Sequence, residues 1–235
     1  MSLGKLRQAL ASYVEVTEMP NIVVSQRQAH EVSRLLLDEE AVLIRPERPF
    51  TFASGIVSPI YCDLRLLMRS PKGRRRVSEL LAGGVKALCG RDEPDAVAGV
   101  ATAGIPWAAW VGDVLHKPVA YVRDTPKGHG RGQQVEGGLR LAQTAVVVED
   151  LTSTGASAIT AVEGLRQIGV RADYVLSVFT YGSPRADRNF GNAWVRAASL
   201  CTAATVLDVA VASERITPEQ RDLVRHWLQT GPMSG

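Results

Sequence analysis

The sequence predicts an α/β protein with a central, mostly parallel sheet flanked by helices. Strand-like and helix-like segments alternate between residues 96 and 180, which is typical of a doubly wound sheet. Val146, Val147 and Val148 form an unbroken β-branched run that suits a strand covered on both faces. With 235 residues, 46% of them hydrophobic, the chain is long enough to bury one sizeable core.

The elements are expected in a simple order. Residues 25–38 have the apolar spacing of an amphipathic helix, and residues 50–63 indicate a hairpin-like pair of short strands. The alternating segments that follow are helix 72–88, strand 96–100, helix 105–115, strand 119–122, loop 124–138, strand 144–149, helix 155–168 and strand 172–180. Thr217 and Pro218 open a last helix that extends to about Leu228, because proline is favoured at the first helical position.

Composition argues against several classes of partner. No apolar stretch reaches membrane-spanning length, and the N-terminus lacks the apolar region of a signal peptide. A net charge of +3 is too small to imply a nucleic-acid partner by itself. Cys62, Cys89 and Cys201 are odd in number and widely spaced, which argues against a disulfide framework or a zinc site. We therefore expect a soluble, cytoplasmic protein that binds neither membrane nor nucleic acid.

Two adjacent carboxylates follow the valine run. Glu149 and Asp150 fall at the carboxyl end of the predicted strand, which is where parallel sheets bind ligands. Two carboxylates side by side are costly to bury without partners, so water, a metal or a ligand rich in hydroxyl groups must meet them. A sugar diol fits that requirement.

The turn after the carboxylates offers donors for a phosphate. Thr152, Ser153 and Thr154 supply hydroxyl groups, and Gly155 lets several backbone N–H groups point at one anion before a helix begins. The alternative is that Asp150 merely caps that helix, since such turns are common in α/β proteins. The sequence has no G-x-x-x-x-G-K-[ST] run and no G-x-G-x-x-G opening a helix, which disfavours P-loop hydrolysis and dinucleotide binding.

A glycine-rich segment after Tyr121 forms a second chemical centre. Arg123, Lys127, His129 and Arg131 are interspersed with glycines, so basic side chains stand on a segment that cannot hold one shape unaided. We expect a mobile cationic lid over a polyanion such as pyrophosphate, whose departure needs charge neutralisation. An ordinary surface loop is the alternative.

A second turn between a strand and a helix spans Gly99 to Pro106. Thr102, Ala103 and Gly104 can lend backbone amides to a further phosphate group. A plain connection without a ligand is the alternative for this segment.

Four segments together resemble one protein family. VVVEDLTSTGAS, at residues 146–157, resembles the phosphoribosyl pyrophosphate (PRPP) motif of type I phosphoribosyltransferases. Three more resemble the orotate phosphoribosyltransferases of that family: PFTFASGIVSPIYCDLR at 49–65, GVATAGIPWA at 99–108 and YVRDTPKGHGRGQQVEG at 121–137. The four occur in the family's order, and the resemblance covers about residues 25–183.

The resemblance implies a fold and an activity. The fold would be the type I phosphoribosyltransferase fold, a single domain over 25–235 with a core at about 72–182 and a small hood at about 45–66 plus C-terminal elements. Residues 1–24 would be an extension without a predicted role. The activity would be transfer of the phosphoribosyl group of PRPP to orotate in pyrimidine biosynthesis. Mg²⁺ would arrive on the pyrophosphate, and a homodimer would place each 123–137 loop over the neighbouring active site.

The resemblance also assigns residues by motif position. The implied catalytic residues are Arg123, Lys127, His129 and Asp150. PRPP-binding positions are those four and Thr102, Ala103, Gly104, Glu149, Leu151, Thr152, Ser153, Thr154, Gly155 and Ala156. Orotate-binding positions are Ser54, Gly55, Tyr61 and Ser153. No side chain is assigned as a direct metal ligand.

The chain departs from the family pattern at several positions. Ala53, Ala103 and Asp124 stand where relatives carry lysine, and no arginine near Thr180 and Tyr181 matches the one that recognises orotate in some relatives. Two other functions remain open at this point. One is a phosphoribosyltransferase for a purine base, and the other is a catalytically weak regulator that senses PRPP or nucleotides.

Overall fold

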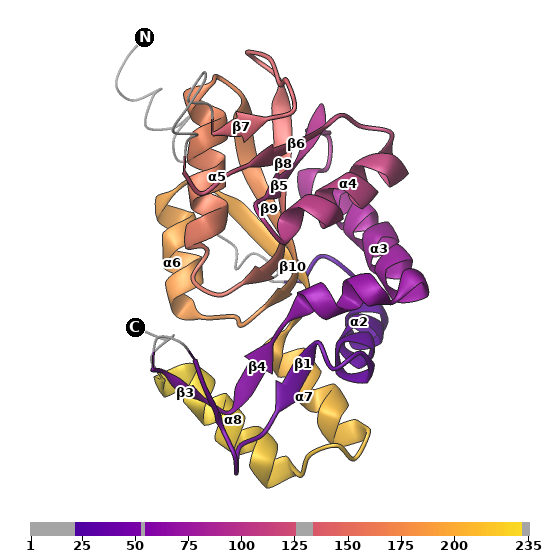
Figure 1. Cartoon of the computed structure of the whole chain (residues 1–235), viewed down its shortest axis with the longest axis vertical. Coiled ribbons are helices and arrows are strands. Elements are labelled where there is room, and N and C mark those ends of the chain that lie inside the picture. The colour runs from indigo at the N-terminus through magenta and orange to yellow at the C-terminus, as the bar shows by residue number, and fades with distance from the viewer. Residues whose placement is uncertain (1–21, 53–54, 126–133, 232–235) are drawn as a thin grey trace, which may run out of the picture.

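A six-stranded sheet forms the centre of the computed structural model, which describes residues 22–52, 55–125 and 134–231 (Figure 1). The strand order is β10-β9-β8-β5-β6-β7. All neighbours are parallel except β6 and β7, which are antiparallel. The bounds are β5 (Ala96–Val100), β6 (Val119–Val122), β7 (Val135–Glu136), β8 (Thr144–Thr152), β9 (Arg171–Thr180) and β10 (Arg196–Thr202). The predicted α/β class with a mostly parallel sheet is confirmed.

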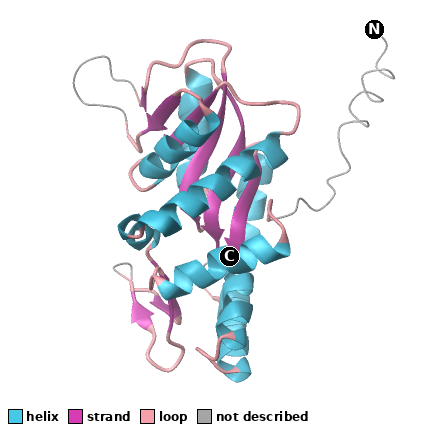
Figure 2. Ribbon diagram, turned by 90° about the vertical axis from the view of Figure 1, so that its right-hand side faces the viewer, coloured by secondary structure: helices cyan, strands magenta, loops and turns pink. Residues whose placement is uncertain are grey.

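Helices cover both faces of the sheet. Side chains alternate along a strand, so Val146 and Val148 of β8 join one apolar cluster while Val147 joins the other. The α-helices of the first cluster are α2 (Gln26–Asp38), α3 (Pro71–Cys89), α4 (Gly104–Leu115), α7 (Ala203–Ala212) and α8 (Pro218–Thr230), and those of the second are α5 (Ala156–Gln167) and α6 (Pro184–Asn192). Figure 2, which views the molecule from the α3 and α4 side, shows helices crossing in front of the strands.

The hood consists of two small antiparallel sheets. The strands β2 (Phe50–Thr51) and β3 (Val57–Ser58) form the hairpin expected within 50–63, whereas β4 (Ile60–Cys62) pairs with β1 (Val42–Ile44), a strand that the sequence analysis missed. A short 3-10 helix, η1 (Leu64–Arg69), follows β4. The last helix, α8 (Pro218–Thr230), reaches the hood, because Gln220 donates a hydrogen bond to Glu47 at 2.8 Å.

The C-terminal third differs most from the sequence prediction. The elements α6, β10 and α7 were not predicted, and β8 continues to Thr152 rather than ending at Glu149. β10 consists largely of small residues, which give no β-branched signal. α6 is polar and short, yet Ser183 caps it and Pro184 occupies its first turn, which are recognised start signals for a helix.

Two further expectations can be compared with the described residues. Cys62, Cys89 and Cys201 are free thiols, as predicted, and the last two are buried. Among the described helices, none has the length and apolarity needed to cross a lipid bilayer. The predicted site residues Ser54, Lys127 and His129 lie outside the described residues, as do residues 1–21 of the expected N-terminal extension.

Candidate active site

The strand order places a topological switch point between β5 and β8, and we call the edge of the sheet at the carboxyl ends of these two strands the crevice. From β5 the chain moves to β6 on one side, whereas β8 leads to β9 and β10 on the other side. The connections that leave these two neighbouring strands therefore diverge, and ligands of parallel sheets bind at such a switch point. Both predicted phosphate turns, 99–106 and 149–155, follow these two strands.

Close backbone contact joins the two turns. A Cβ atom on Gly104 would lie 2.6 Å from the Val148 carbonyl oxygen and 3.3 Å from the Glu149 Cα. A Cβ atom on Gly99 would lie 2.8 Å from the Gly104 carbonyl oxygen. Glycine at these positions lets the first turn of α4 reach the end of β8, and the Ala101–Thr102 peptide between them is cis. The structure thus brings the 102–104 segment beside Glu149.

The predicted carboxylate pair lies at this crevice with both pKa values raised. Glu149 is 8% exposed, and burial, followed by the charges of Asp150 and Asp124, raises its pKa to about 8. Burial also raises the pKa of Asp150, although the Leu151 amide and the Arg65 guanidinium oppose that change. No described residue donates a hydrogen bond to the Glu149 carboxyl group. Both groups are therefore costly to ionise unless donors or positive charge come to them.

Contacts with α6 and β9 hold the turn after the pair. Thr152 donates a hydrogen bond to Ser177 at 3.1 Å. The Ser183 hydroxyl donates to the Ser153 carbonyl oxygen at 3.0 Å, and the Asn189 amide donates to the Thr154 carbonyl oxygen at 2.9 Å. Two carbonyl groups of the turn are thereby fixed by α6, an element that the sequence analysis did not foresee.

The start of α5 lacks a side-chain cap. Its N-cap is Gly155, with φ of 78° and no side-chain hydrogen bond to the helix. The alternative that Asp150 caps this helix is therefore wrong. A Cβ atom on Gly155 would lie 2.7 Å from the Phe190 ring, so α6 also requires glycine here. The uncapped N–H groups that begin at Ala156 are suited to an anion.

The base of the predicted lid is a short antiparallel ladder. Arg123 is half-buried; its N–H donates to the Gln134 carbonyl oxygen at 3.0 Å, and the Gln134 side chain donates to the Arg123 carbonyl oxygen at 2.8 Å. The segment predicted as loop 124–138 in fact contains β7, which pairs with β6. Asp124 is exposed at this base, and its charge acts on Glu149. The structure thus places Arg123 and Asp124 near the crevice.

The hood carries an aromatic cluster. The ring of Tyr61, half-exposed on β4, lies 5.4 Å from the Phe50 ring and 6.1 Å from the Phe52 ring between centroids. Gly55 is exposed between β2 and β3 with φ of 83°. Tyr61 therefore lies in the hood and outside the two apolar clusters of the main sheet.

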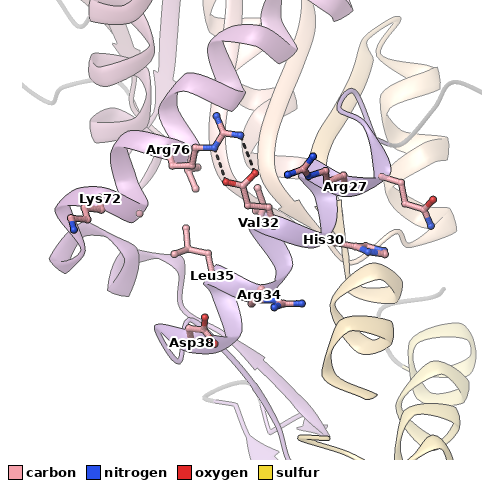
Figure 3. Close-up of a pocket in the computed structure, with 12 residues that line it drawn as sticks. Arg27, His30, Val32, Arg34, Leu35, Asp38, Lys72 and Arg76 are labelled. Carbon is pink, nitrogen blue, oxygen red and sulfur yellow. Dashed lines mark hydrogen bonds and ion pairs between the residues drawn. The ribbon is translucent and has the colours of Figure 1, made fainter. Parts of the chain in front are cut away.

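A separate groove of about 800 Å³ lies between α2 and the first turns of α3 (Figure 3). Its lining includes Arg27, His30, Arg34 and Lys72, and Arg76 forms hydrogen bonds with Glu31 at 2.7 and 2.9 Å. None of the predicted site residues lines this groove. The candidate active site is therefore the crevice at the ends of β5 and β8.

Residues 67–191 match the phosphoribosyl transferase domain family, and the carboxylate pair and both turns at the switch point of the sheet lie within this match. The orotate phosphoribosyltransferase of Listeria monocytogenes is 41% identical over 197 residues, which is 84% of this chain and 93% of that protein. The Bacillus subtilis enzyme of the same name is 42% identical over 198 residues, 83% and 90% of the two chains. The crystal structure of orotate phosphoribosyltransferase from Aeropyrum pernix is 34% identical, with a TM-score of 0.65 over 75% of this chain and 96% of that one. The chain belongs to the orotate phosphoribosyltransferase family.

Proposed function

We propose that this chain transfers the 5-phosphoribosyl group of PRPP to orotate, which gives orotidine 5′-monophosphate and pyrophosphate in the synthesis of UMP. The observation that carries this function is the adjacent pair of the buried Glu149 and the half-buried Asp150, which lies between two turns suited to an anion. The pair accepts the 2- and 3-hydroxyl groups of the ribose. These hydroxyl groups supply the donors that the buried carboxyl groups need.

The turn 151–156 holds the 5-phosphate, and the 102–104 turn faces the pyrophosphate. Each hydrogen bond from an amide or hydroxyl group to a charged phosphate contributes about 1.5–3 kcal/mol, against about 0.3–1 kcal/mol for the helix dipole. The amide and hydroxyl donors of the turn therefore dominate phosphate binding. Tethering of the Ser153 and Thr154 carbonyl groups to α6 supports this function, because it keeps the turn in one shape.

Mg²⁺ is proposed to enter as the chelate of the pyrophosphate. In the described part of the chain, no group of three or more His, Cys, Asp or Glu side chains is placed to hold a metal ion. The raised pKa values of Glu149 and Asp150 fit a site whose ligand brings positive charge with it. When bound, the ion neutralises charge on the leaving group.

The chemical step is a displacement at the anomeric carbon of the ribose. As its bond to pyrophosphate stretches, the ribose gains positive charge, which the Glu149 and Asp150 carboxylates stabilise. N1 of orotate forms the new bond to the anomeric carbon and gives up its proton, while the bond from that carbon to the pyrophosphate oxygen breaks. Pyrophosphate leaves with the electron pair and takes up the proton. Arg123, Lys127 and His129 are proposed to neutralise the leaving group, in a homodimer whose 123–137 loop covers the neighbouring site. Asp124, beside them, reduces the positive charge available for that task.

The base is proposed to bind between the hood and the crevice. Tyr61 stacks on the planar ring, while Ser54, Gly55 and Ser153 supply polar contacts. The position of Tyr61 in a half-exposed aromatic cluster, rather than in the core, supports this assignment.

The test is a direct assay with Mg²⁺ and PRPP. Loss of orotate absorbance is followed, with uracil, adenine and hypoxanthine as alternative bases. Turnover of orotate alone supports the proposed function. Turnover of a purine would instead indicate a purine-type enzyme, and binding of PRPP without turnover of any base would indicate a regulator.

A further inference from the structure

An orotate site needs a cation, but the orotate-binding positions predicted from the sequence, Ser54, Gly55, Tyr61 and Ser153, include none. Orotate carries a carboxylate on its planar ring, and such a group is bound most strongly by charge-assisted hydrogen bonds. The described residues at the crevice include four acids, Asp63, Asp124, Glu149 and Asp150, whose charges act on one another. Without a positive group on the base side, this surface would repel an anionic base.

Arg65 stands at the junction of the hood and the crevice. It lies in η1, which directly follows the Tyr61 strand β4 and contacts β8. The Arg65 charge acts on Asp150, where it opposes the rise in pKa, and the Tyr61 and Asp150 charges act on Arg65 in return. The guanidinium group is therefore close enough to interact electrostatically with both the proposed stacking ring and the proposed ribose-binding carboxylate, and its helix contacts the strand that carries Asp150.

Asp63 holds the guanidinium group in a fixed orientation. The Arg65 Nε lies 2.7 Å from Asp63 Oδ1, and Arg65 NH2 lies 2.8 Å from Asp63 Oδ2. Asp63 is itself fixed, because its side chain is 18% exposed and accepts the Arg65 backbone N–H at the start of η1. This two-point pairing occupies one edge of the guanidinium plane.

The opposite edge of Arg65 remains available. The side chain is 66% exposed, and NH1 has no hydrogen-bond partner among the described residues. A guanidinium group has five N–H donors in one plane, so the NH1 and NH2 edge can bind a second carboxylate while Asp63 keeps the first.

Neighbouring arginines are engaged elsewhere. Arg69, also in η1, donates to the Glu39 carbonyl oxygen at 2.8 Å. Arg74 donates to the Met68 carbonyl oxygen at 2.7 Å and lies over the Trp110 ring. Arg65 is thus the described arginine that combines a free donor edge with proximity to Asp150.

We propose that Arg65 determines specificity by binding the carboxylate of the base substrate through its free NH1 and NH2 edge, with Asp63 as the positioning residue. This proposal rests on the proposed function, since it names the group that recognises the orotate carboxylate. It also assigns a role to the DLR tripeptide that ends the hood motif.

The experiment compares ligands that differ only in the carboxylate. Orotidine 5′-monophosphate and UMP are titrated against the wild type and Arg65→Gln, and KM values for orotate and PRPP are measured for both proteins. In Arg65→Gln we expect about a 10- to 100-fold loss of orotidine 5′-monophosphate affinity and a similar rise in KM for orotate. UMP affinity and KM for PRPP should change less than about threefold, since neither ligand presents the carboxylate.

Arg69→Gln is the matched control, because it removes an arginine from the same short helix whose donors face Glu39. It should leave the ratio of the two nucleotide affinities unchanged. Equal loss of both nucleotides in Arg65→Gln, or no loss of either, would overturn the assignment. If Arg65→Gln does not fold, Arg65→Lys must still weaken orotidine 5′-monophosphate more than UMP. A wild type that turns over no orotate would contradict the proposed function instead, so the two failures are distinguishable.

Discussion

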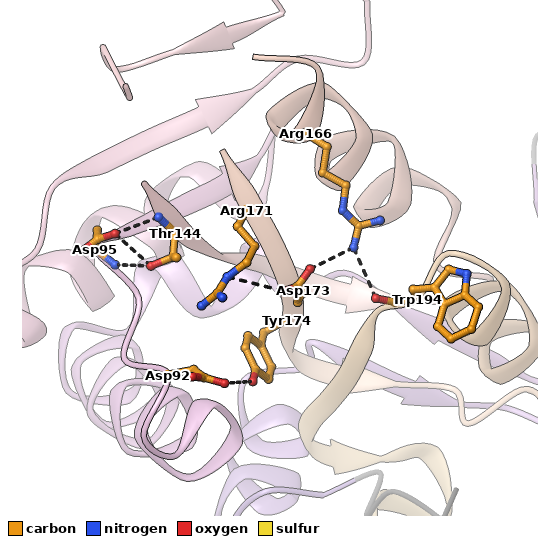
Figure 4. Close-up of polar contacts among 8 residues, drawn as sticks. All are labelled: Asp92, Asp95, Thr144, Arg166, Arg171, Asp173, Tyr174 and Trp194. Carbon is orange, nitrogen blue, oxygen red and sulfur yellow. Dashed lines mark hydrogen bonds and ion pairs between the residues drawn. The ribbon is translucent and has the colours of Figure 1, made fainter. Parts of the chain in front are cut away.

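The carboxylates at the two ends of the sheet's strands differ in their partners and in the direction of their pKa shifts. At the amino ends, every carboxylate drawn in Figure 4 has a partner. Asp95, which precedes β5, accepts hydrogen bonds from the Thr144 N–H and hydroxyl groups at 2.8 and 3.0 Å. Asp173, near the start of β9, pairs with Arg166 and Arg171 at 3.2 and 3.6 Å. The hydrogen bonds from Thr144 lower the pKa of Asp95.

At the carboxyl ends the pattern reverses. Burial raises the pKa values of both Glu149 and Asp150, and their mutual repulsion adds to the rise for Glu149. The amino ends therefore contribute to stability through satisfied, exposed pairs. At the carboxyl ends, ionisation of two carboxyl groups costs free energy, and a bound ligand can supply the hydrogen-bond donors that these groups lack. We infer that this difference separates residues that maintain the fold from residues that are proposed to act on substrate.

The strongest way to test that separation is Asp150→Asn. Loss of the negative charge at the ribose should lower kcat/KM for PRPP by about 100- to 1000-fold, because the carboxylate acts on charge that develops in the transition state. The melting temperature should stay the same or rise, since the buried charge is costly. Steady-state kinetics and thermal melting check both expectations. An equal loss of stability and activity would indicate a structural role for Asp150.

A second test uses pH and stability in Glu149→Gln. The pKa of Glu149 is about 8 in the folded state, above its ordinary value of 4.5. As pH rises, this group therefore ionises at a lower pH in the unfolded state than in the folded state. The wild type therefore loses stability as pH rises from about 4.5 to 8, and the variant does not. We expect a melting temperature above that of the wild type by at least about 3 °C at pH 8, with little difference at pH 4.5. A pH-independent difference would show that Glu149 is not held protonated by its surroundings.

The smallest expected effect is that of Asp95→Asn at the amino ends. The pKa of Asp95 is lowered in the folded state, so its contribution to stability is present above its unfolded value and is lost as pH falls through the folded value. The variant should melt slightly below the wild type at neutral pH and equal it in acid, with kcat/KM within about twofold. A large loss of activity in Asp95→Asn would contradict the claim that carboxylates at the amino ends of the sheet serve stability rather than activity.

Much of this contrast is readable from sequence. Three valines followed by Glu149 and Asp150 predict a buried strand with a costly acidic pair near its end. The structure has both the strand and the pair, although β8 continues past the pair to Thr152. The contacts that support the 152–155 turn could not be predicted from the sequence. They come from Asn189 and Phe190, which follow β9 and are therefore distant from the turn along the chain. Local patterns carry no information on such tertiary partners.

The hood shows the same limit. The FTFASG and SPIY segments predicted short strands, yet the pairing of β4 with β1 joins residues that are 16 to 20 positions apart, such as Ile44 with Ile60 and Val42 with Cys62. Arg65 ends the hood motif but received no role from the sequence, since local sequence does not show which acids an exposed arginine lies near. Its proximity to Asp150 depends on how η1 packs against β8.

The most direct test of the role of the sheet's carboxyl edge is a crystal structure of the chain with PRPP and Mg²⁺. We predict the ribose hydroxyl groups within hydrogen-bond distance of Glu149 and Asp150, with the 5-phosphate on the amides of residues 152–156. PRPP bound in the groove between α2 and α3, or carboxyl groups of Glu149 and Asp150 that point away from the sugar, would contradict it.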